Sequence, residues 1–560
     1  MIDRISLENF KSFGKRSEIR LAPLTMLYGQ NSAGKSSIIH SLYLLKQSLA
    51  SDSPTVFGAQ PDDSIVNLGS FSDAVFNQDN ERTIRIGISV NRSNSAPSSY
   101  GVSLRNRVVP RLDTGYAEME FRRTSAVGYL HAITLYEPTT GKLLVRLEAI
   151  HTAATIAKKL QSNQPYDFKV VDFARNTEFW TPFYNWCSSA EGKEHIGKTL
   201  GDYIQHWEDL SSEDSPRKFK TTVAREIENL KEMHEFYQSN FTVHKFIARL
   251  KTSMGETTLS LHGVSGRSFS GNRTYEAMFE NSLEPPRSKK EAQQKHAAPF
   301  APGVQLFNSA AYLGGVFTLL LRETIDTSSS FIGPFREAPK RFQPLRGRQT
   351  SSVGVKGENT AELLKRDRKL LERANEWLRR LEIPYSLEAR NLGGHLLSYT
   401  QILLTDSSRK ATEKRKQVRH TLADVGFGIS QILPIICDCI FRKNSIIFIE
   451  QPELHIHPRL QAHLADLFIW SINERGNQIV AETHSEHLIL RVMKRLRQTS
   501  EDTKTTDKTF TNKQFVAQYV LKGTGSKGAE VKEINLTSDG KLKDEWPGGF
   551  FPERRNELVG

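Results

Sequence analysis

A short run of small and basic residues near the N-terminus has the residue types and spacing that hold phosphate groups. Two glycines with four residues between them are followed by a lysine and two serines, in the order Gly29, Gln30, Asn31, Ser32, Ala33, Gly34, Lys35, Ser36 and Ser37. Successive backbone N–H groups of such a loop point inward and cradle phosphates. We expect Lys35 to neutralise phosphate charge and the Ser36 hydroxyl to hold Mg²⁺. The predicted ligand is a nucleoside triphosphate, ATP, with Mg²⁺.

The elements on either side of this loop fit the same interpretation. Residues 25–28 predict a short buried strand that leads into the loop, and residues 36–49 predict a helix that leads out of it. The N-terminus of a helix attracts phosphate through its unpaired N–H groups and its dipole. The context therefore argues against a chance occurrence of the pattern.

A second predicted strand ends in acidic and amide side chains. Residues 445–449 are largely apolar, and Glu450, Gln451 and Glu453 follow them closely. Such a run is typical of a parallel strand that is covered on both faces and carries polar chemistry at its C-terminal edge. We expect Glu450 to hold Mg²⁺, directly or through water. The alternative is an acidic residue that merely ends a strand.

Two further segments are candidates for the same nucleotide-binding site. The glycine-rich run at 425–431 contains Gly426, Gly428, Ser430 and Gln431. Its glycines permit close backbone approach, its serine offers a hydroxyl, and a predicted helix at 431–440 points its N-terminus at negative charge. An ordinary glycine turn before a core helix is the alternative. The other segment contains His484, which follows a predicted strand at 478–481.

The order of these four segments resembles that of ABC-type ATPases of the recombination and repair branch, which includes the RecF, Rad50 and overcoming-lysogenisation-defect ATPases. The sequence Glu-Gln-Pro-Glu-Leu-His-Ile-His-Pro at 450–458 is similar to that of ATPases from bacterial phage-defence operons. The segment at 544–551, Asp-Glu-Trp-Pro-Gly-Gly-Phe-Phe, fits the same group. Among these, the Septu ATPases (PtuA) are the most similar in length and layout.

The resemblance implies a fold, an assembly and several residue roles. The fold class is α/β, with a P-loop ATPase head of ABC type, an antiparallel β subdomain and an inserted, largely helical domain. The assembly is a head-to-tail homodimer, or a higher oligomer, with two ATP molecules between subunits. In it, the segment 426–431 of one subunit reaches the γ-phosphate bound to the other. His484 takes the place of a switch histidine that senses the γ-phosphate.

One departure from the family pattern bears on catalysis. ABC-type enzymes usually carry Asp and then Glu after the strand, whereas this chain has Glu450 and then Gln451. An amide orients water but cannot accept its proton. Either Glu453 substitutes or hydrolysis is slow, and we predict slow hydrolysis. Arg336 also lies in a family-like run; it either reaches phosphate or a neighbouring subunit, or belongs to a surface turn.

The chain is predicted to consist of three parts. Residues 1–154 form the N-terminal half of the head, because alternating apolar and polar residues there predict antiparallel strands beside the P-loop. Residues 155–300 are charged and predict a helical insertion. Residues 301–560 form the C-terminal half, which includes a predicted helix at 360–381.

Composition and charge limit the classes of protein to which this chain can belong. The chain has 560 residues and only three cysteines, without the spacing of a zinc site. It has neither a signal peptide nor an apolar run near the ~18 residues of a membrane span. We therefore expect a cytoplasmic protein with no membrane partner. The net charge of +13 favours contact with nucleic acid, although a soluble basic surface is the alternative.

The family resemblance and the basic charge imply functions of different classes. The first is a regulatory ATPase that gates a separate HNH-type nuclease in an anti-phage defence complex. The chain has no Asp-x-Asp cluster and no compact HNH signature, so no nuclease activity of its own is expected. The second is a stand-alone DNA-binding repair ATPase of the RecF type. Another defence version joins a retron reverse transcriptase with its small DNA. A transport cassette would require a Leu-Ser-Gly-Gly-Gln signature, which the sequence lacks.

Overall fold

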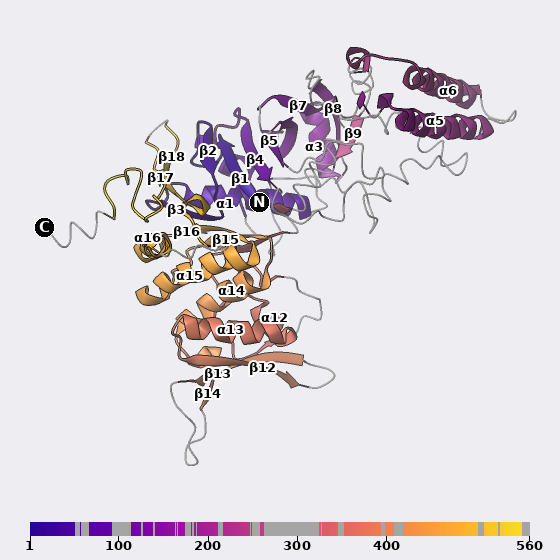
Figure 1. The fold of residues 1–560 in the computed structure, drawn as a ribbon. Coiled ribbons are helices and arrows are strands. Elements are labelled where there is room, and N and C mark those ends of the chain that lie inside the picture. The colour runs from indigo at the N-terminus through magenta and orange to yellow at the C-terminus, as the bar shows by residue number, and fades with distance from the viewer. Residues whose placement is uncertain are drawn as a thin grey trace. The chain divides into compact units, whose positions relative to one another are not determined.

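The computed structural model describes residues 1–50, 57, 67–91, 114–124, 127–137, 141–162, 164, 166–173, 181, 184–185, 187–210, 217–246, 248, 258–261, 324–325, 328–344, 352–393, 398–407, 418–501, 509–524 and 527–551. The chain divides into two compact units (Figure 1). The first contains Met1–Gln47, Phe57–Val90 and Arg322–Gly560, and the second contains Ser48–Val56 and Asn91–Leu321.

A six-stranded sheet forms the centre of the first unit. Its order is β10 (Ser329–Ile332), β15 (Ile446–Glu450), β16 (Gln478–Glu482), β3 (Leu24–Gly29), β17 (Phe515–Leu521) and β18 (Glu530–Ile534). All neighbouring pairs are parallel except the last, which is antiparallel. The C-terminal ends of the first five strands therefore meet at one edge of the sheet, where α/β proteins bind their ligands.

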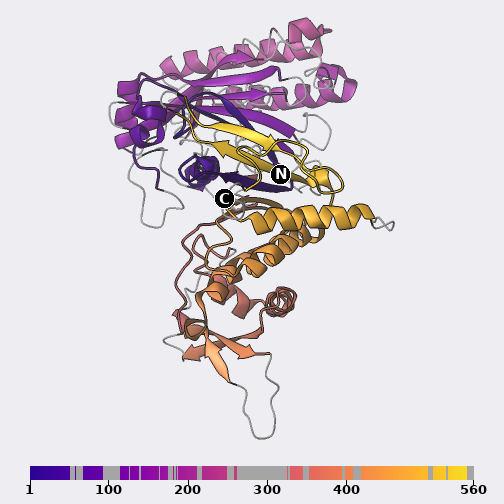
Figure 2. The same cartoon turned by 90° about the vertical axis from the view of Figure 1, so that its left-hand side faces the viewer.

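Helices cover this sheet in layers (Figure 1, Figure 2). The nearest helices are α14 (Phe427–Phe441), α15 (Pro458–Arg475) and α16 (Glu486–Glu501). Beyond them lie α12 (Thr360–Arg366) and α13 (Arg368–Arg380), and then the antiparallel strands β11 (Gln343–Pro344), β12 (Tyr385–Gly393), β13 (Ser398–Asp406) and β14 (Arg419–Thr421). Buried apolar side chains from the sheet and the helices form one continuous cluster, whose burial stabilises the unit.

Three antiparallel strands and a long helix complete the first unit. The strands are β1 (Ile2–Glu8), β2 (Ser17–Arg20) and β4 (Ile84–Asn91), and the helix is α1 (Lys35–Ala50). The buried side chain of Gln478 joins β1 to the parallel sheet, because it accepts from the Ile2 amide at 2.9 Å and donates to the Ile2 carbonyl at 2.6 Å.

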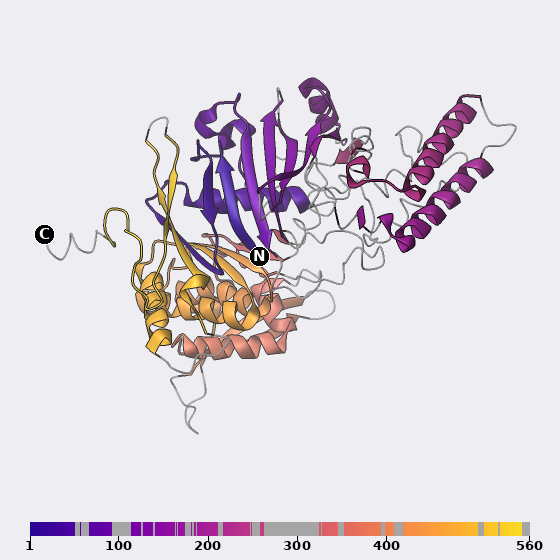
Figure 3. The ribbon, with the colours of Figure 1, turned by 45° about the horizontal axis from the view of Figure 1, so that its top comes forward.

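The second unit contains antiparallel strands and a pair of long helices. The strands are β5 (Thr114–Arg123), β6 (Gly128–Tyr136), β7 (Leu143–Ala149), β8 (Tyr166–Phe173) and β9 (Thr258–Leu261), paired in chain order. A short helix, α3 (Ala153–Gln161), lies between β7 and β8 in the chain. The long helices α5 (Ala190–Leu210) and α6 (Arg217–Gln238) lie side by side (Figure 3).

The predicted α/β class and the alternating strands are confirmed. The single helix predicted at 360–381 is wrong, because Asp367 has extended backbone and caps α13 by accepting from the Leu370 amide. Strands β8 and β9 fall within 155–300, beside the predicted helices. Residues 262–300 lie outside the described residues, and the division into three parts stays a prediction.

In the described parts of the chain, no helix is both long enough and apolar enough to span a membrane.

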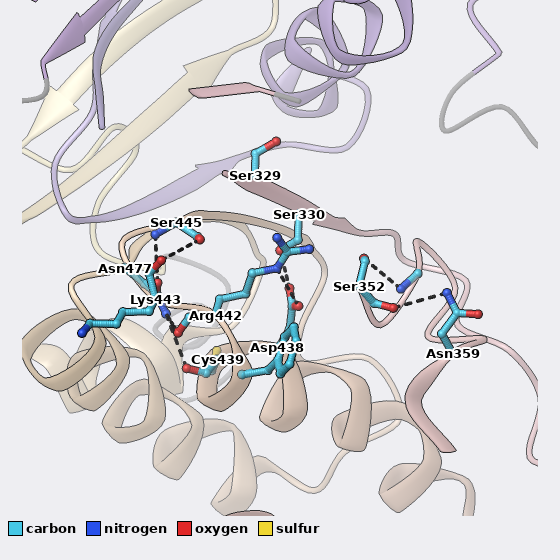
Figure 4. Close-up of polar contacts among 12 residues, drawn as sticks. Ser329, Ser330, Ser352, Asn359, Asp438, Cys439, Arg442, Lys443, Ser445 and Asn477 are labelled. Carbon is cyan, nitrogen blue, oxygen red and sulfur yellow. Dashed lines mark hydrogen bonds and ion pairs between the residues drawn. The ribbon is translucent and has the colours of Figure 1, made fainter. Parts of the chain in front are cut away.

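A buried ionic network lies between α14 and the parallel sheet (Figure 4). The fully buried Asp438 carboxylate accepts from the Ser330 hydroxyl on β10 and from the Arg442 guanidinium at 3.3 Å. Burial raises the pKa of Asp438, and Arg442 and Ser330 oppose this rise. Nearby, the Asn477 side chain accepts from the Ser445 amide at 3.0 Å and donates to the Arg442 carbonyl at 3.1 Å, which fixes the starts of β15 and β16.

We predict that Asp438→Ala lowers the free energy of unfolding of the first unit by about 3 kcal/mol, because the Arg442 charge, on a side chain that is only 11% exposed, loses its partner. Thermal and urea denaturation measure the change. Glu545→Ala, which removes an exposed carboxylate, is the control and should leave the transition unmoved. Equal transitions for both variants would contradict a stabilising network.

Candidate nucleotide-binding site

The P-loop connects β3 to α1, as the sequence predicts. Gly29 ends the strand with a φ of 134°, and a Cβ atom there would lie 2.2 Å from the Val520 carbonyl oxygen of β17. Only glycine fits this conformation and this close approach. The loop then exposes Gln30, Asn31 and Ser32 and buries Ala33, while Gly34 and Ser36 are half-buried and Lys35 and Ser37 are buried at the start of α1.

The Lys35 side chain lies over the loop. Its Nζ donates to the carbonyl oxygens of Gly29 and Gln30, both at 2.9 Å. Burial lowers the pKa of Lys35, while the carboxylates of Glu482 and Glu453 oppose the change. The loop therefore holds a cation beside two acidic side chains.

Two carboxylates lie side by side at the edge of the sheet. Glu450 ends β15 and Glu482 ends β16, and the two residues are direct partners in the parallel register. Both are buried, and His40 Nε2 on α1 lies 3.5 Å from Glu450 Oε1. Burial raises the pKa of Glu482, a hydrogen bond with Ser36 lowers it, and the Glu450 charge raises it further.

This oxygen-rich edge fits Mg²⁺. Glu482 Oε2 is buried and has no hydrogen-bond partner among the described residues. Carboxylate and hydroxyl oxygens are the ligands that Mg²⁺ prefers, and one or two carboxylates suffice when phosphates supply the rest. Ser36 and Glu450 are the residues that would hold the ion, with Glu482 beside them; when bound, the ion would offset phosphate charge. Within the described ranges, no group of three or more His, Cys, Asp or Glu side chains is arranged to hold a metal by itself.

Glu482 was not assigned a role from the sequence. The available signal was its position, since it ends a buried strand just as Glu450 does. Two acidic residues at the C-terminal ends of parallel strands meet whenever the strands are neighbours. The order of strands in the sheet is a tertiary property, and local sequence patterns do not determine it.

The Glu453 side chain, which follows β15, is hydrogen-bonded to the residues that follow β16. Its Oε2 accepts from the Thr483 hydroxyl and its Oε1 from the His484 amide, both at 2.7 Å. Burial raises the pKa of Glu453, and these bonds oppose the rise. His484 keeps an exposed surface, and partial desolvation and then the Lys35 charge lower its pKa. The Lys35 charge therefore disfavours the protonated form of His484.

Gln451 and Arg336 meet at the end of β15. Gln451 has a φ of 46°, in the left-handed region, and its amide donates to the Glu482 carbonyl at 2.8 Å. Arg336, in the loop after β10, is only 6% exposed and donates to the carbonyls of Glu450 and Gln451. Of the two interpretations of Arg336, the surface turn is therefore wrong.

The glycine-rich segment begins a helix earlier than predicted. Helix α14 starts at Phe427, not at residue 431, and Gly426 precedes it. The helix includes Gly428, where a Cβ atom would lie 2.8 Å from the His455 carbonyl oxygen. Gly426 is exposed, whereas Ser430 and Gln431 are buried. A role of this segment toward a second subunit stays a prediction.

Together these residues form one edge of the parallel sheet, with a cation and two carboxylates beside the P-loop. The P-loop, its lysine and the carboxylates of β15 and β16 lie around one helix N-terminus, which is the arrangement of a P-loop nucleotide-binding protein. A sequence model described as the AAA ATPase domain matches residues 1–256 and 349–489. The chain therefore belongs to the AAA ATPase domain family.

Solved structures with a similar course of the chain are heads of Smc proteins. One is the Smc head domain with an extended coiled coil, bound to the C-terminal domain of ScpA, derived from Pyrococcus furiosus; the identity is 12%, the coverage 95% of this chain and 96% of that chain, and the TM-score 0.36. The SMC head domain from Thermotoga maritima has 8% identity, 96% and 99% coverage and a TM-score of 0.34. No curated protein matches the chain. The class of this protein is therefore assigned from the AAA ATPase domain family and from the residues of the site, not from these structures.

We predict that Lys35→Ala weakens ATP binding on the order of 100-fold, because it removes a charged hydrogen-bond donor to phosphate, a contact of about 1.5–3 kcal/mol. Equilibrium titration with a fluorescent ATP analogue measures the change. Lys532→Ala, on the exposed surface of β18, is the matched control. Tight binding retained by Lys35→Ala would refute the site.

We predict that Glu482→Gln raises the melting temperature of the ligand-free protein by about 2–4 °C at pH 7.5, since it removes about 1 kcal/mol of buried-charge cost. The raised pKa means that the folded protein holds this proton more tightly than the unfolded chain. The cost therefore appears as the pH rises through the folded pKa, and the gain should vanish below the ordinary Glu pKa of about 4.3. Glu530→Gln, at an exposed position, is the control. A gain that does not depend on pH would contradict this account.

Proposed function

We propose that this chain is the ATP-binding, slowly hydrolysing regulatory subunit of a cytoplasmic bacterial anti-phage defence complex that gates a separate HNH-type nuclease. The observation that carries the proposal is the pair Glu450 and Gln451 at the end of β15. The carboxylate serves the metal, while the amide stands where a general base is usual. Such a site favours a bound state over rapid turnover.

The surroundings of Gln451 support slow hydrolysis. Glu453, the nearest alternative base in the sequence, already accepts hydrogen bonds with both carboxylate oxygens. An amide orients water without taking its proton, and general-base catalysis contributes about 10²- to 10⁴-fold to a rate. ATP would then mainly hold a dimer or a partner-binding state. The Septu-like sequence at 450–458 supports the defence role of that state.

A stand-alone DNA-binding repair ATPase is the second candidate function. The net charge of +13 favours it, because basic surfaces bind DNA by releasing counterions. The two candidates differ in what accompanies the protein in its cell: a nuclease in the first case, and bulk DNA in the second.

Turnover by the purified protein is predicted to lie below about 10 s⁻¹, the median for enzymes generally. Gln451→Glu should raise kcat at least about 10-fold, since it supplies the missing proton acceptor without changing side-chain length. A phosphate-release assay measures both proteins, with Gln498→Glu on α16 as a control. Fast wild-type turnover would count against the proposal, as would a Gln451→Glu variant that hydrolyses no faster than the wild type.

The partner is tested by a tagged pull-down from the native cell, with mass spectrometry and a nucleic-acid gel of the eluate. Stoichiometric recovery of an HNH nuclease supports nuclease gating. A reverse transcriptase with small DNA would indicate the retron version of the complex. A homodimer that recovers only bulk DNA would replace the proposal by the repair ATPase.

A further inference from the structure

Arg336 has contacts that are unusual for an arginine that only stabilises a fold. Its Nη2 donates to the Glu450 carbonyl at 2.9 Å and to the Gln451 carbonyl at 3.2 Å. Its Nε and Nη1 atoms are buried without a hydrogen-bond partner in the part of the chain that the structure describes. The guanidinium is therefore committed to one short stretch of backbone and is otherwise unsatisfied.

Such an arrangement is costly for the fold. An unpaired buried donor destabilises a protein, and buried charges are often replaceable by apolar side chains without loss of stability. Burial lowers the pKa of Arg336 to about 10, even though the carboxylates of Glu453 and Glu450 favour the charged form. An unsatisfied buried group calls for an explanation other than stability. The backbone that Arg336 holds offers such an explanation.

That backbone is the pair of peptide groups on either side of Gln451. Arg336 holds the carbonyl of the preceding peptide and the carbonyl of the following one. The amide of the preceding peptide donates to the Glu482 carbonyl of β16. Because peptide groups are planar, fixing both of them fixes the direction of the Cα–Cβ bond between them. The left-handed φ of 46° at Gln451 needs such support, since that region is unfavourable for residues other than glycine.

We propose that Arg336 is a positioning residue for ATP hydrolysis: it holds both peptide groups that flank Gln451 and so fixes where the Gln451 amide orients the attacking water. The inference rests on the proposed function of this chain as a slow ATPase. Misplacement of a catalytic group by about 1 Å lowers a rate by about 100-fold. In this inference Arg336 acts through the position of Gln451.

The test is a double-mutant cycle between the two positions. The kcat for ATP and the affinity for an ATP analogue are measured for the wild type, Arg336→Gln, Gln451→Ala and the double variant, under single-turnover conditions with excess enzyme. We expect Arg336→Gln to lower kcat about 10- to 100-fold with analogue affinity within threefold of the wild type. In the Gln451→Ala background the same change should have no further effect, because the residue that it positions is gone.

Two variants separate positioning from folding. Arg336→Lys retains a cationic donor to carbonyl oxygens and should restore at least a third of the wild-type kcat. Arg475→Gln is the matched control, since Arg475 also donates to two backbone carbonyls, those of Arg442 and Phe441 at 3.1 Å, but away from the strand ends that carry the site. It should leave kcat unchanged.

The other outcomes overturn the inference. Independent, multiplicative losses in the cycle would show that Arg336 does not act through Gln451. A parallel loss of analogue affinity and melting temperature, or failure of both Arg336 variants to fold, would make it a structural residue. Failure of the wild type to bind or hydrolyse ATP would instead refute the proposed function, so the two failures are distinguishable.

Discussion

The parallel register of β15, β16 and β3 is the constraint on which the site depends. It brings the ends of three buried strands to one edge, so that Glu450 lies beside Glu482, and Glu482 lies near Lys35. Buried carboxylates next to each other are unfavourable unless cations or hydrogen bonds compensate them. The P-loop lysine and a hydrogen bond with Ser36 supply that compensation at Glu482 on the protein's own side. A metal and a triphosphate would complete the balance of charge.

The chain turn after β15 carries Gln451, the candidate catalytic side chain at this edge of the sheet. Gln451 is held in the left-handed region by bonds from Arg336 and to β16, while Glu453 bonds to the turn after β16. The ends of β15 and β16 are therefore linked through both backbone and side chains.

The sequence predicted the parts of the site that depend on local pattern. The P-loop, its flanking elements and the strand before Glu450 follow from apolar runs, glycines and hydroxyl residues, and each lies where it was expected. Glu482 was missed because its role depends on which strands are neighbours. The sequence left two interpretations of Arg336, because its burial depends on how the loop after β10 contacts the end of β15. Helix α14 begins at Phe427, and Gly428 in its first turn packs closely against His455, a tertiary contact that no local pattern indicates.

One measurement tests the central claim, that the edge formed by β3, β15 and β16 is an Mg²⁺–ATP site. The purified wild-type protein is titrated with a fluorescent ATP analogue, with and without Mg²⁺. Our account predicts saturable binding of one nucleotide per chain that is tighter with Mg²⁺, because phosphate and carboxylate oxygens share the ion. Absence of saturable binding, or binding that does not respond to Mg²⁺, would contradict it.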